Sequence, residues 1–255
     1  MRYSFRTVLV TGASAGIGAA CAHAFAGAGA RLLLAARRAE RLEALAAELR
    51  DAHGTESRLL ELDVRDAEAV AAVLGALPAE WAEVDVLVNN AGLGRGLEKA
   101  HEGRPADWDE MVDTNVKGLL YVTRAVLPGM VARGRGHVVN IGSVAGHEVY
   151  PGGAVYCATK HAVDAITRGL RMDLLGTGVR VSTVDPGMVE TEFSVVRFHG
   201  DRERADRVYA GMTPLVADDV ADAVLWCATR PPHVNVDEII LKPTDQASAT
   251  LVSRK

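Results

Sequence analysis

The chain has 255 residues, 49% of them hydrophobic and 24% charged, which is enough for a well-buried core. A formal net charge of −5, without a basic stripe, argues against binding to nucleic acid. Residues 1–6 lack the apolar region of a signal peptide, and no apolar run reaches the length of a membrane span. We therefore expect a cytoplasmic protein that does not bind membranes.

The cysteines and histidines show no ligand pattern. Cys21, Cys157 and Cys227 are odd in number and far apart, which is typical of free thiols in a reducing compartment. No two histidines stand at a metal-ligand spacing, so we expect no metal site. No Pro/Ser-rich linker, repeat or low-complexity run divides the chain, which predicts a single domain over residues 1–255.

Seven short apolar runs alternate with helical patterns along the chain. They cover residues 7–10, 31–35, 58–62, 84–89, 137–141, 180–184 and 238–241. Their mostly continuous apolar character is typical of strands buried on both faces of a parallel sheet. The alternation predicts a doubly wound α/β fold of the Rossmann type, with a mostly parallel seven-stranded sheet and helices on both faces.

A glycine-rich turn follows the first apolar run. Residues 11–18 read Thr-Gly-Ala-Ser-Ala-Gly-Ile-Gly and lead into an alanine-rich amphipathic stretch at 19–27. Strand, glycine turn and helix in this order favour a dinucleotide-binding loop over a merely flexible turn. Gly12 would allow the sharp turn, while Gly16 and Gly18 would allow close approach of the cofactor and of helix to strand. The pyrophosphate would lie at the helix amino terminus, where free N–H groups favour anions.

Tyr156 and Lys160 are four residues apart, so on a helix both side chains share one face. Ser143 follows the run at 137–141 and would lie at the carboxyl end of that strand, where open α/β sheets bind ligands. A nearby ammonium favours the phenolate, and a serine hydroxyl would orient the reacting oxygen. Alone, such a pair is usually ordinary helix surface; with the glycine turn it favours a proton-transfer site beside a carbonyl.

Two asparagine positions add to this pattern. Asn89 ends the run at 84–89, and Asn90 follows it, directly before a small-residue turn. Asn115 lies in a predicted helix, where asparagine is an indifferent helix former. By itself Asn115 is equally compatible with a solvated helix residue, a local kink or a water-binding position.

Together these motifs stand in the order and spacing of the short-chain dehydrogenase/reductase family, which the chain resembles from about residue 7 to 243. The segments at 77–81, 124–130 and 192–198 are similar to the family's NADP-dependent 3-hydroxy acid dehydrogenase branch, whose members act on serine, allo-threonine and malonic semialdehyde. The resemblance implies four catalytic residues. Tyr156 would transfer the proton and Ser143 would bind the substrate oxygen. Lys160 would hold the nicotinamide ribose and lower the pKa of Tyr156, and Asn115 would hold a water that relays protons.

The resemblance also implies a cofactor site and an assembly. The expected cofactor-binding residues are Gly12, Ala13, Ser14, Gly16, Ile17, Gly18, Asp63, Val64, Asn90, Tyr156, Lys160, Pro186, Gly187, Val189 and Thr191. Asp63 and Val64 would flank the adenine. Members of the family commonly pair two helices across a two-fold axis, here the stretches 111–130 and 155–174, which implies a homotetramer. The broad apolar stripes of these stretches are also compatible with contacts to the core alone.

Cofactor choice is predicted from the residues after the second strand. The chain reads Ala-Ala-Arg-Arg at 35–38, where an NAD-binding protein would carry an acidic residue. The guanidinium groups of Arg37 and Arg38 suit a 2′-phosphate, which predicts NADP. Alternatively, the two arginines only begin a charged helix over 38–50. Ala15 stands where many NADP-dependent relatives carry a basic residue, so discrimination would rest on the arginine pair.

The segment at 193–207 is charged, lacks periodicity and follows the sixth strand. It is compatible with a solvated loop and nothing more, but a place above the predicted cleft favours a substrate lid, within about 190–212. A 3-hydroxy acid needs a cation for its carboxylate, and Arg197 is the candidate. Alternatively, it is a surface arginine paired with Glu190, Glu192 or Asp201.

The segment at 147–153 would line the acyl end of the pocket, and Tyr209 and Met212 would add apolar wall. The motifs and the family resemblance predict an NADP-dependent oxidoreductase whose small-molecule substrate is a short 3-hydroxy acid or the corresponding 3-oxo acid or semialdehyde. A general carbonyl reductase and a non-catalytic NADP-binding sensor are the alternatives.

Overall fold

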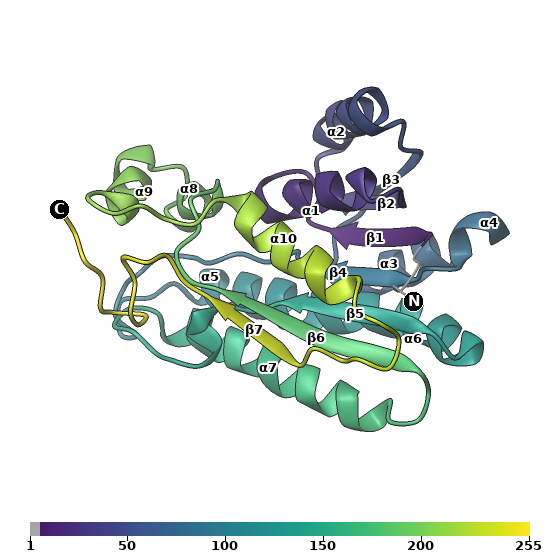
Figure 1. Ribbon diagram of the computed structural model, residues 1–255. Coiled ribbons are helices and arrows are strands. Elements are labelled where there is room, and N and C mark those ends of the chain that lie inside the picture. The colour runs from purple at the N-terminus through teal and green to yellow at the C-terminus, as the bar shows by residue number, and fades with distance from the viewer. Residues whose placement is uncertain (1–5) are drawn as a thin grey trace.

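The computed structural model describes residues 6–255, so residues 1–5, part of the segment expected to lack a signal peptide, lie outside it. One sheet of seven strands forms the centre, in the order β3-β2-β1-β4-β5-β6-β7, and every neighbouring pair is parallel (Figure 1). The strands are β1 (Thr7–Thr11), β2 (Arg31–Ala36), β3 (Ser57–Glu61), β4 (Val86–Asn89), β5 (Gly136–Ile141), β6 (Val179–Pro186) and β7 (Glu238–Leu241).

Helices cover both faces of this sheet. One hydrophobic cluster contains residues of α1, α2 and α10, and a second contains residues of α3, α6 and α7. The helices are α1 (Gly16–Gly27), α2 (Ala39–His53), α3 (Ala67–Gly75), α4 (Ala79–Ala82), α5 (Pro105–Val112), α6 (Leu119–Arg133), α7 (Ala154–Asp173), α8 (Phe193–Arg197), α9 (Arg202–Tyr209) and α10 (Ala217–Ala228). The predicted doubly wound fold is confirmed. Within residues 6–255, no helix combines the length and apolar character needed to cross a membrane.

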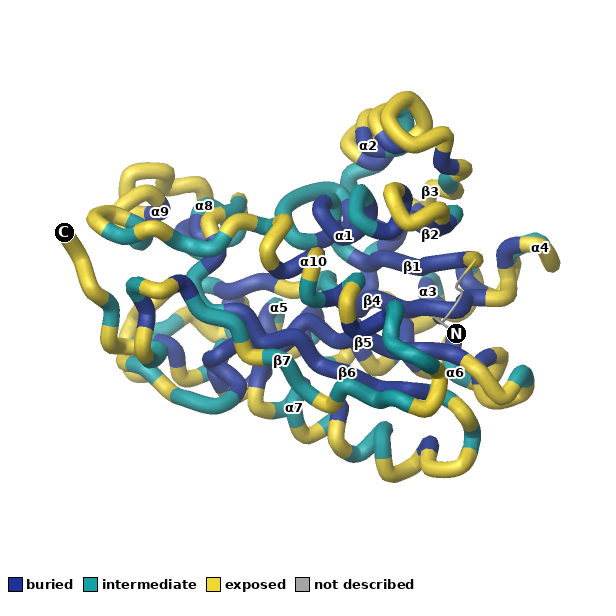
Figure 2. Tube along the Cα trace, viewed as in Figure 1, coloured by how far each residue is buried: buried dark blue, intermediate teal, exposed yellow. Residues whose placement is uncertain are grey.

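The central strands are buried on both faces, as their continuous apolar runs predict. Val8 and Val10 belong to one hydrophobic cluster and Leu9 to the other, because successive side chains of a strand point to opposite faces. The edge strands differ: Leu59 in β3 is 36% exposed and Ile240 in β7 is 48% exposed. An edge strand has a neighbouring strand on one side only, so less of it is covered (Figure 2).

A chain of buried amides joins the sheet to the helices that cover it. Asn89 Nδ2 donates to Thr123 Oγ1 on α6 at 2.8 Å and to Asn140 Oδ1 on β5 at 2.9 Å. Asn140 Nδ2 in turn donates to Thr167 Oγ1 on α7 at 2.8 Å. Because buried polar groups need such partners, these bonds fix the position of α7 against β5.

The order of strands reverses between β1 and β4, since β2 follows on one side of β1 while β4 pairs on the other. Ligands of open α/β sheets bind beyond the carboxyl ends of the strands at such a switch point. The loops after β1, β4, β5 and β6 all leave the sheet at this edge. They carry most of the polar motifs found in the sequence.

Two segments differ locally from expectation. The non-periodic segment at 193–207, predicted to be a substrate lid, consists mostly of the short helices α8 and α9. Asp201 accepts a hydrogen bond from Arg204 N and so caps α9, in which only Ala205 is buried. Because one buried position gives almost no apolar periodicity, the pattern did not indicate a helix. Asn115 lies in a π-helical turn, Asp113–Gly118, between α5 and α6.

Candidate active site

The glycine-rich turn has the sharp geometry that its sequence predicts. Gly12 and Gly16 adopt φ angles of 64° and 53°, in the left-handed region that favours glycine. Helix α1 begins at Gly16, earlier than expected, so its first N–H groups lie beside the turn. A Cβ atom on Gly18 would lie 2.3 Å from Gly12 O. Gly18 therefore serves the close approach of α1 to the turn.

Asn90 joins the glycine turn to the end of β4. Its side-chain Nδ2 donates to the carbonyl oxygens of Thr11 at 2.9 Å and Gly12 at 3.2 Å. Thr11 Oγ1 accepts the N–H groups of Asn90 and Ala91, each at 3.0 Å. These bonds hold the two loops on either side of the switch point together.

A cavity of about 520 Å³ lies at this edge of the sheet. Such a volume falls in the range of about 300–1,000 Å³ that is usual for small-molecule sites. The predicted site residues that line it are Gly12, Ser14, Gly16, Ile17, Arg37, Arg38, Asp63, Val64, Asn90, Ser143, Tyr156, Lys160, Pro186, Gly187, Val189, Thr191 and Arg197.

Three of the predicted catalytic and cofactor-binding residues are not among the residues that line the cavity. Ala13 is fully buried, with its N–H bonded to Ala35 O at 3.2 Å. Gly18 lies inside α1, and Asn115 is buried, although its neighbour Thr114 lines the cavity. Ala13 and Gly18 support the glycine turn on the side away from the cavity, because their side-chain positions face the protein interior.

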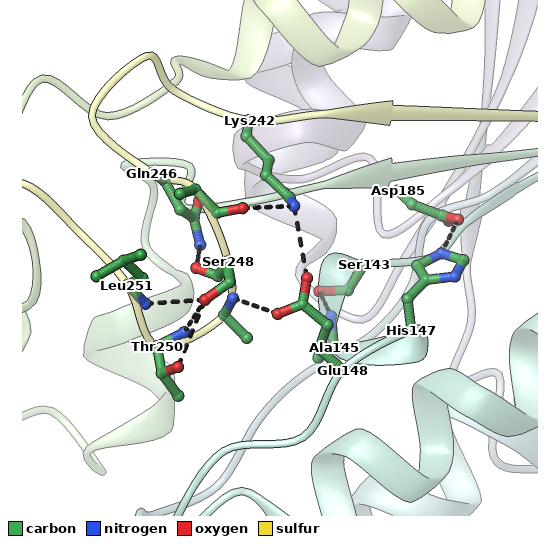
Figure 3. A network of polar contacts seen from close by, with 12 residues as sticks. Ser143, Ala145, His147, Glu148, Asp185, Lys242, Gln246, Ser248, Thr250 and Leu251 are labelled. Atoms are coloured by element: carbon green, nitrogen blue, oxygen red, sulfur yellow. Dashed lines mark hydrogen bonds and ion pairs between the residues drawn. The ribbon is translucent and has the colours of Figure 1, made fainter.

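Three of the four predicted catalytic residues, Ser143, Tyr156 and Lys160, line the cavity together. Helix α7 places Lys160 Nζ 6.0 Å from the ring centroid of Tyr156, and that Nζ donates to Ile141 O at 2.8 Å. Ser143 lies at the amino end of a 3₁₀ turn, where its Oγ accepts from Ala145 N at 3.1 Å (Figure 3). The carboxyl end of β5 and one face of α7 thus meet as predicted.

Burial is the largest influence on the pKa values of Tyr156 and Lys160. It raises the pKa of Tyr156, while the charge of Arg197 and a hydrogen bond with Ser143 lower that pKa part of the way. Burial also lowers the pKa of Lys160 to about 8, against the opposing charge of Asp185. The expected lowering of the Tyr156 pKa by Lys160 is not the effect seen, since Arg197 supplies the nearby positive charge.

Asn115 fixes a backbone segment beside Lys160. Its Oδ1 accepts from Leu93 N and its Nδ2 donates to Leu93 O, both at 2.8 Å. A second bond runs from Nδ2 to Thr159 Oγ1 on α7 at 3.0 Å. The π-helical turn brings Asn115 to this position, so its side chain is fully engaged and not a solvated helix residue.

The arginines after β2 are arranged differently from the expected pair. Arg38 donates to Ser14 Oγ from Nε at 3.2 Å and from Nη2 at 3.0 Å. Its Nη1 lies 3.2 Å from Glu192 Oε2, and Arg41 Nη1 lies 2.8 Å from both oxygens of Glu192. Arg37 lines the cavity nearer Asp63, whose pKa is lowered chiefly by its hydrogen bonds with Arg65. Arg41 is three residues after Arg38 at the start of α2, a spacing that could have identified it.

Arg197 lies inside the cavity and not on the surface. Its Cζ atom is 4.9 Å from the ring centroids of both Tyr156 and Phe193, and its Nη2 donates to Tyr150 Oη at 3.1 Å. Its Nε is buried without a hydrogen-bond partner among the described residues. A Cβ atom on Gly94 would lie 2.8 Å from that Nε. The expected alternative, a surface ion pair, does not describe this arginine.

The carboxyl-terminal segment forms a wall that the sequence analysis did not identify. Gln246 and Ala249 line the cavity. Gln246 Oε1 accepts from Met188 N at 2.8 Å. Glu148 Oε2 accepts from Ala249 N at 2.7 Å, which holds this segment against the residues after β5 (Figure 3). Tyr209 lines the cavity as expected, whereas Met212 is not among its lining residues.

A second group of polar residues also escaped the sequence analysis. His147 Nε2 lies 2.7 Å from Asp185 Oδ2 and 2.9 Å from Glu238 Oε1. Their ligand atoms lie within 4.8 Å of one another, close enough for a metal ion. These residues are far apart in sequence, so spacing gave no signal, and the expectation that the protein has no metal site stays a prediction.

Known proteins resemble the chain over nearly its whole length. The family model described as short chain dehydrogenase matches residues 6–201. The chain belongs to the short-chain dehydrogenase family. It is 50% identical over 245 residues to the NADP-dependent 3-hydroxy acid dehydrogenase of Salmonella typhi, covering 96% of this chain and 97% of the relative. It is 49% identical to sulfoacetaldehyde reductase 2 of Chromohalobacter salexigens, covering 97% of this chain and 98% of that protein.

A solved structure gives the same result for the fold of this dehydrogenase. The closed form of a serine dehydrogenase complexed with NADP+ superimposes with a TM-score of 0.91. It is 47% identical, and the match covers 98% of this chain and 99% of that chain. The predicted family, with its resemblance to the 3-hydroxy acid dehydrogenase branch, is confirmed.

The residues present fit a dinucleotide with a 2′-phosphate. The positive φ angles of Gly12 and Gly16 give backbone room where a side chain would be strained. Arg38 and Arg41 already hold an anion, the carboxylate of Glu192, beside Ser14. Two guanidinium groups that bind one oxyanion are suited to bind another.

The buried ammonium of Lys160 predicts a pH dependence of stability. In the unfolded chain its pKa is near 10.5 and in the folded protein about 8, a difference worth roughly 3 kcal/mol. Between pH 8 and 10.5 the unfolded state binds one more proton at this site, so this contribution to the free energy of unfolding rises with pH. Below pH 8 it is a constant cost.

Urea unfolding of the parent and Lys160→Met between pH 7 and 10.5 tests this. The parent should gain stability relative to Lys160→Met as the pH rises through that window. A difference between the two proteins that stays constant with pH would contradict the burial of a titrating ammonium. The lost bond to Ile141 O changes only the pH-independent offset.

Proposed function

We propose that the protein is an NADP-dependent oxidoreductase that transfers hydride between nicotinamide and a short 3-hydroxy acid or the corresponding semialdehyde or 3-oxo acid. The observation that carries this is the Arg197 guanidinium, 4.9 Å from the ring of Tyr156 inside the cavity. A cation so near the proton donor suits a substrate whose carboxylate is only one or two carbons from the reacting carbon. The relative named as a 3-hydroxy acid dehydrogenase supports this class of substrate.

The residues of this chain supply proton transfer and orientation, while bound NADP supplies or accepts the hydride. Because burial raises the pKa of Tyr156, the phenol carries its proton at neutral pH and is ready to protonate a carbonyl oxygen. Ser143 Oγ orients that oxygen, and Lys160 Nζ binds the ribose hydroxyls. In the oxidative direction, the charge of Arg197 favours the phenolate that removes the alcohol proton.

Asn115 contributes to this mechanism by holding the backbone beside Lys160 in place. Its two bonds to the Leu93 backbone fix the cavity wall beside Lys160. The relay of protons through a water held by Asn115 stays a prediction. Helices α8 and α9, with the residues around them at 190–212, act as the substrate lid of a single domain over residues 1–255.

NADP is the cofactor favoured over NAD. Arg38 and Arg41 form an oxyanion site at the end of β2, and Arg37 lies next to it along the chain. The relatives named as NADP-dependent and the serine dehydrogenase complexed with NADP+ support the same choice. The 2′-hydroxyl of NAD is neutral and forms no ion pair with these guanidinium groups, so NAD should bind more weakly than NADP.

The two alternatives are less well supported. A general carbonyl reductase does not need a cation beside its phenol inside the cavity, and Arg197 therefore favours an acidic substrate. The relative named as a sulfoacetaldehyde reductase is compatible with an anionic substrate as well. A non-catalytic NADP sensor would have no use for Ser143, Tyr156 and Lys160 around one cavity.

Tyr156→Phe tests the reaction itself. Loss of the phenol oxygen should lower kcat by about 10²–10⁴, since that is the usual contribution of a positioned general acid. Consumption of NADPH with a panel of 3-oxo acids and semialdehydes measures it. Tyr121→Phe, on the outer helix α6, is the matched control and should keep the parent rate. Turnover of Tyr156→Phe within tenfold of the parent would exclude the role.

Arg197→Met tests the substrate class. Loss of a charge-assisted contact of about 1.5–3 kcal/mol should raise KM for an acidic substrate roughly 10- to 100-fold. The KM of a neutral carbonyl compound of similar size should change much less. Steady-state kinetics with both substrates decides the matter, and equal effects on the two would favour a general carbonyl reductase.

We also infer a cytoplasmic homotetramer. Apolar side chains are exposed on the two helices expected to pair, with Leu120 and Val131 on α6 about 40% exposed and Met172 on α7 79% exposed. Cys21, Cys157 and Cys227 are buried free thiols, as suits a reducing compartment. Light scattering at micromolar concentration should give four times the mass of one chain, and a monomer would refute the assembly.

A further inference from the structure

We propose that Glu192 is an internal competitor for the 2′-phosphate of NADP, and that displacement of its carboxylate from Arg38 and Arg41 couples cofactor binding to the substrate lid. This inference rests on the proposed use of NADP. It assigns Arg41 to the phosphate site and gives Glu192 a role in cofactor discrimination.

Glu192 binds the arginines in the way that a phosphate would. Arg41 Nη1 lies 2.8 Å from each carboxylate oxygen, and Arg38 Nη1 lies 3.2 Å from Oε2. The other two nitrogens of the Arg38 guanidinium face Ser14 Oγ in the glycine turn. These contacts lower the pKa of Glu192, with Arg41 as the larger cause, so the residue is a carboxylate at neutral pH. The oxyanion site of the cofactor loop is therefore engaged by the protein's own anion.

This ion pair is weak enough to be replaced. The side chains of Arg38, Arg41 and Glu192 are 41%, 42% and 48% exposed, and half-exposed ion pairs contribute little net stability. A phosphate monoester carries about 1.5–2 negative charges and three acceptor oxygens, more than a carboxylate. Two anions held by the same guanidinium groups repel each other, so the stronger one displaces the weaker.

Glu192 also connects the phosphate site to the substrate side of the cavity. It directly precedes α8 and accepts the backbone bond from Val196 N that opens this helix. The same helix carries Phe193, whose ring lies 5.6 Å from that of Tyr156, and Arg197. One end of this short element is thus bound to the arginines and the other end contacts the catalytic tyrosine.

Cofactor discrimination follows from this arrangement. A dinucleotide with a 2′-phosphate releases the amino end of α8 from Arg38 and Arg41. A dinucleotide with only a 2′-hydroxyl leaves that end bound, because a hydroxyl does not compete with a carboxylate for two guanidinium groups. Glu192 therefore weakens the binding of ligands that carry a 2′-phosphate. It also makes the position of the lid depend on whether such a ligand is bound.

Calorimetric titration of the full-length protein with adenosine 2′,5′-bisphosphate and with 5′-AMP tests the competition without turnover. Glu192→Gln should bind the bisphosphate about three- to tenfold more tightly than the parent, as expected from loss of two half-exposed ion pairs. Its affinity for 5′-AMP should stay within twofold. Arg41→Gln should bind the bisphosphate more weakly. Glu190→Gln, a change at a nearby exposed carboxylate outside this ion pair, is the matched control and should behave as the parent.

Hydrogen exchange of the amides at 191–200 tests the coupling to the lid. In the parent, the bisphosphate should change their exchange and 5′-AMP should not. In Glu192→Gln the two ligands should act alike, because no ion pair remains to be broken. Equal responses of the parent to both ligands would overturn the coupling.

Three outcomes of the titrations are decisive. An unchanged or weaker affinity of Glu192→Gln for the bisphosphate overturns the competition and leaves the proposed function intact. Weaker binding of 5′-AMP by Glu192→Gln would show that Glu192 instead binds the ribose hydroxyls, and this result also overturns the competition. If the bisphosphate binds neither the parent nor any variant, both this inference and the NADP assignment fail.

Discussion

The parallel hydrogen-bond register of the central strands is the constraint on which the site depends. Val10 pairs with Val88, and Asn89 pairs with Asn140, so β1, β4 and β5 end at the same edge of the sheet. Each loop that follows therefore starts beside the others. The bonds of Asn90 to the glycine turn join the loops after β1 and β4, and the bond of Lys160 to Ile141 O holds α7 against the end of β5.

Burial gives this edge its chemistry. Removal from water favours the neutral forms of both Tyr156 and Lys160, raising the pKa of one and lowering that of the other. The charge of Arg197 lowers the pKa of Tyr156 and so opposes the effect of burial. This charge is permanent, because a guanidinium keeps its proton in surroundings where an ammonium loses it. The same arginine is thus suited both to a substrate carboxylate and to the phenolate form of Tyr156.

The sequence by itself determined the fold and singled out the residues that we propose to be catalytic. Seven apolar runs were enough to locate the seven strands. The central strands are apolar throughout because they are buried on both faces, whereas the edge strands β3 and β7 keep enough apolar residues to be recognised although they are partly exposed. The positions of Gly12, Gly16, Tyr156 and Lys160 followed from local spacing, which a turn or a helix converts directly into geometry. The helices α8 and α9 within the predicted lid were not anticipated, because they bury too few residues to show a helical period.

Only the tertiary structure decided which charged groups meet. Glu192 is 151 residues from Arg41, and His147, Asp185 and Glu238 come from three separate segments. It also decided that Arg197 enters the cavity, that the carboxyl-terminal segment forms a wall, and that Asn115 binds the Leu93 backbone. Long-range pairing leaves no trace in local spacing, because a charged side chain on the surface and one in a cavity occur in similar sequence contexts. Their partners are fixed by the packing of loops at one edge of the sheet.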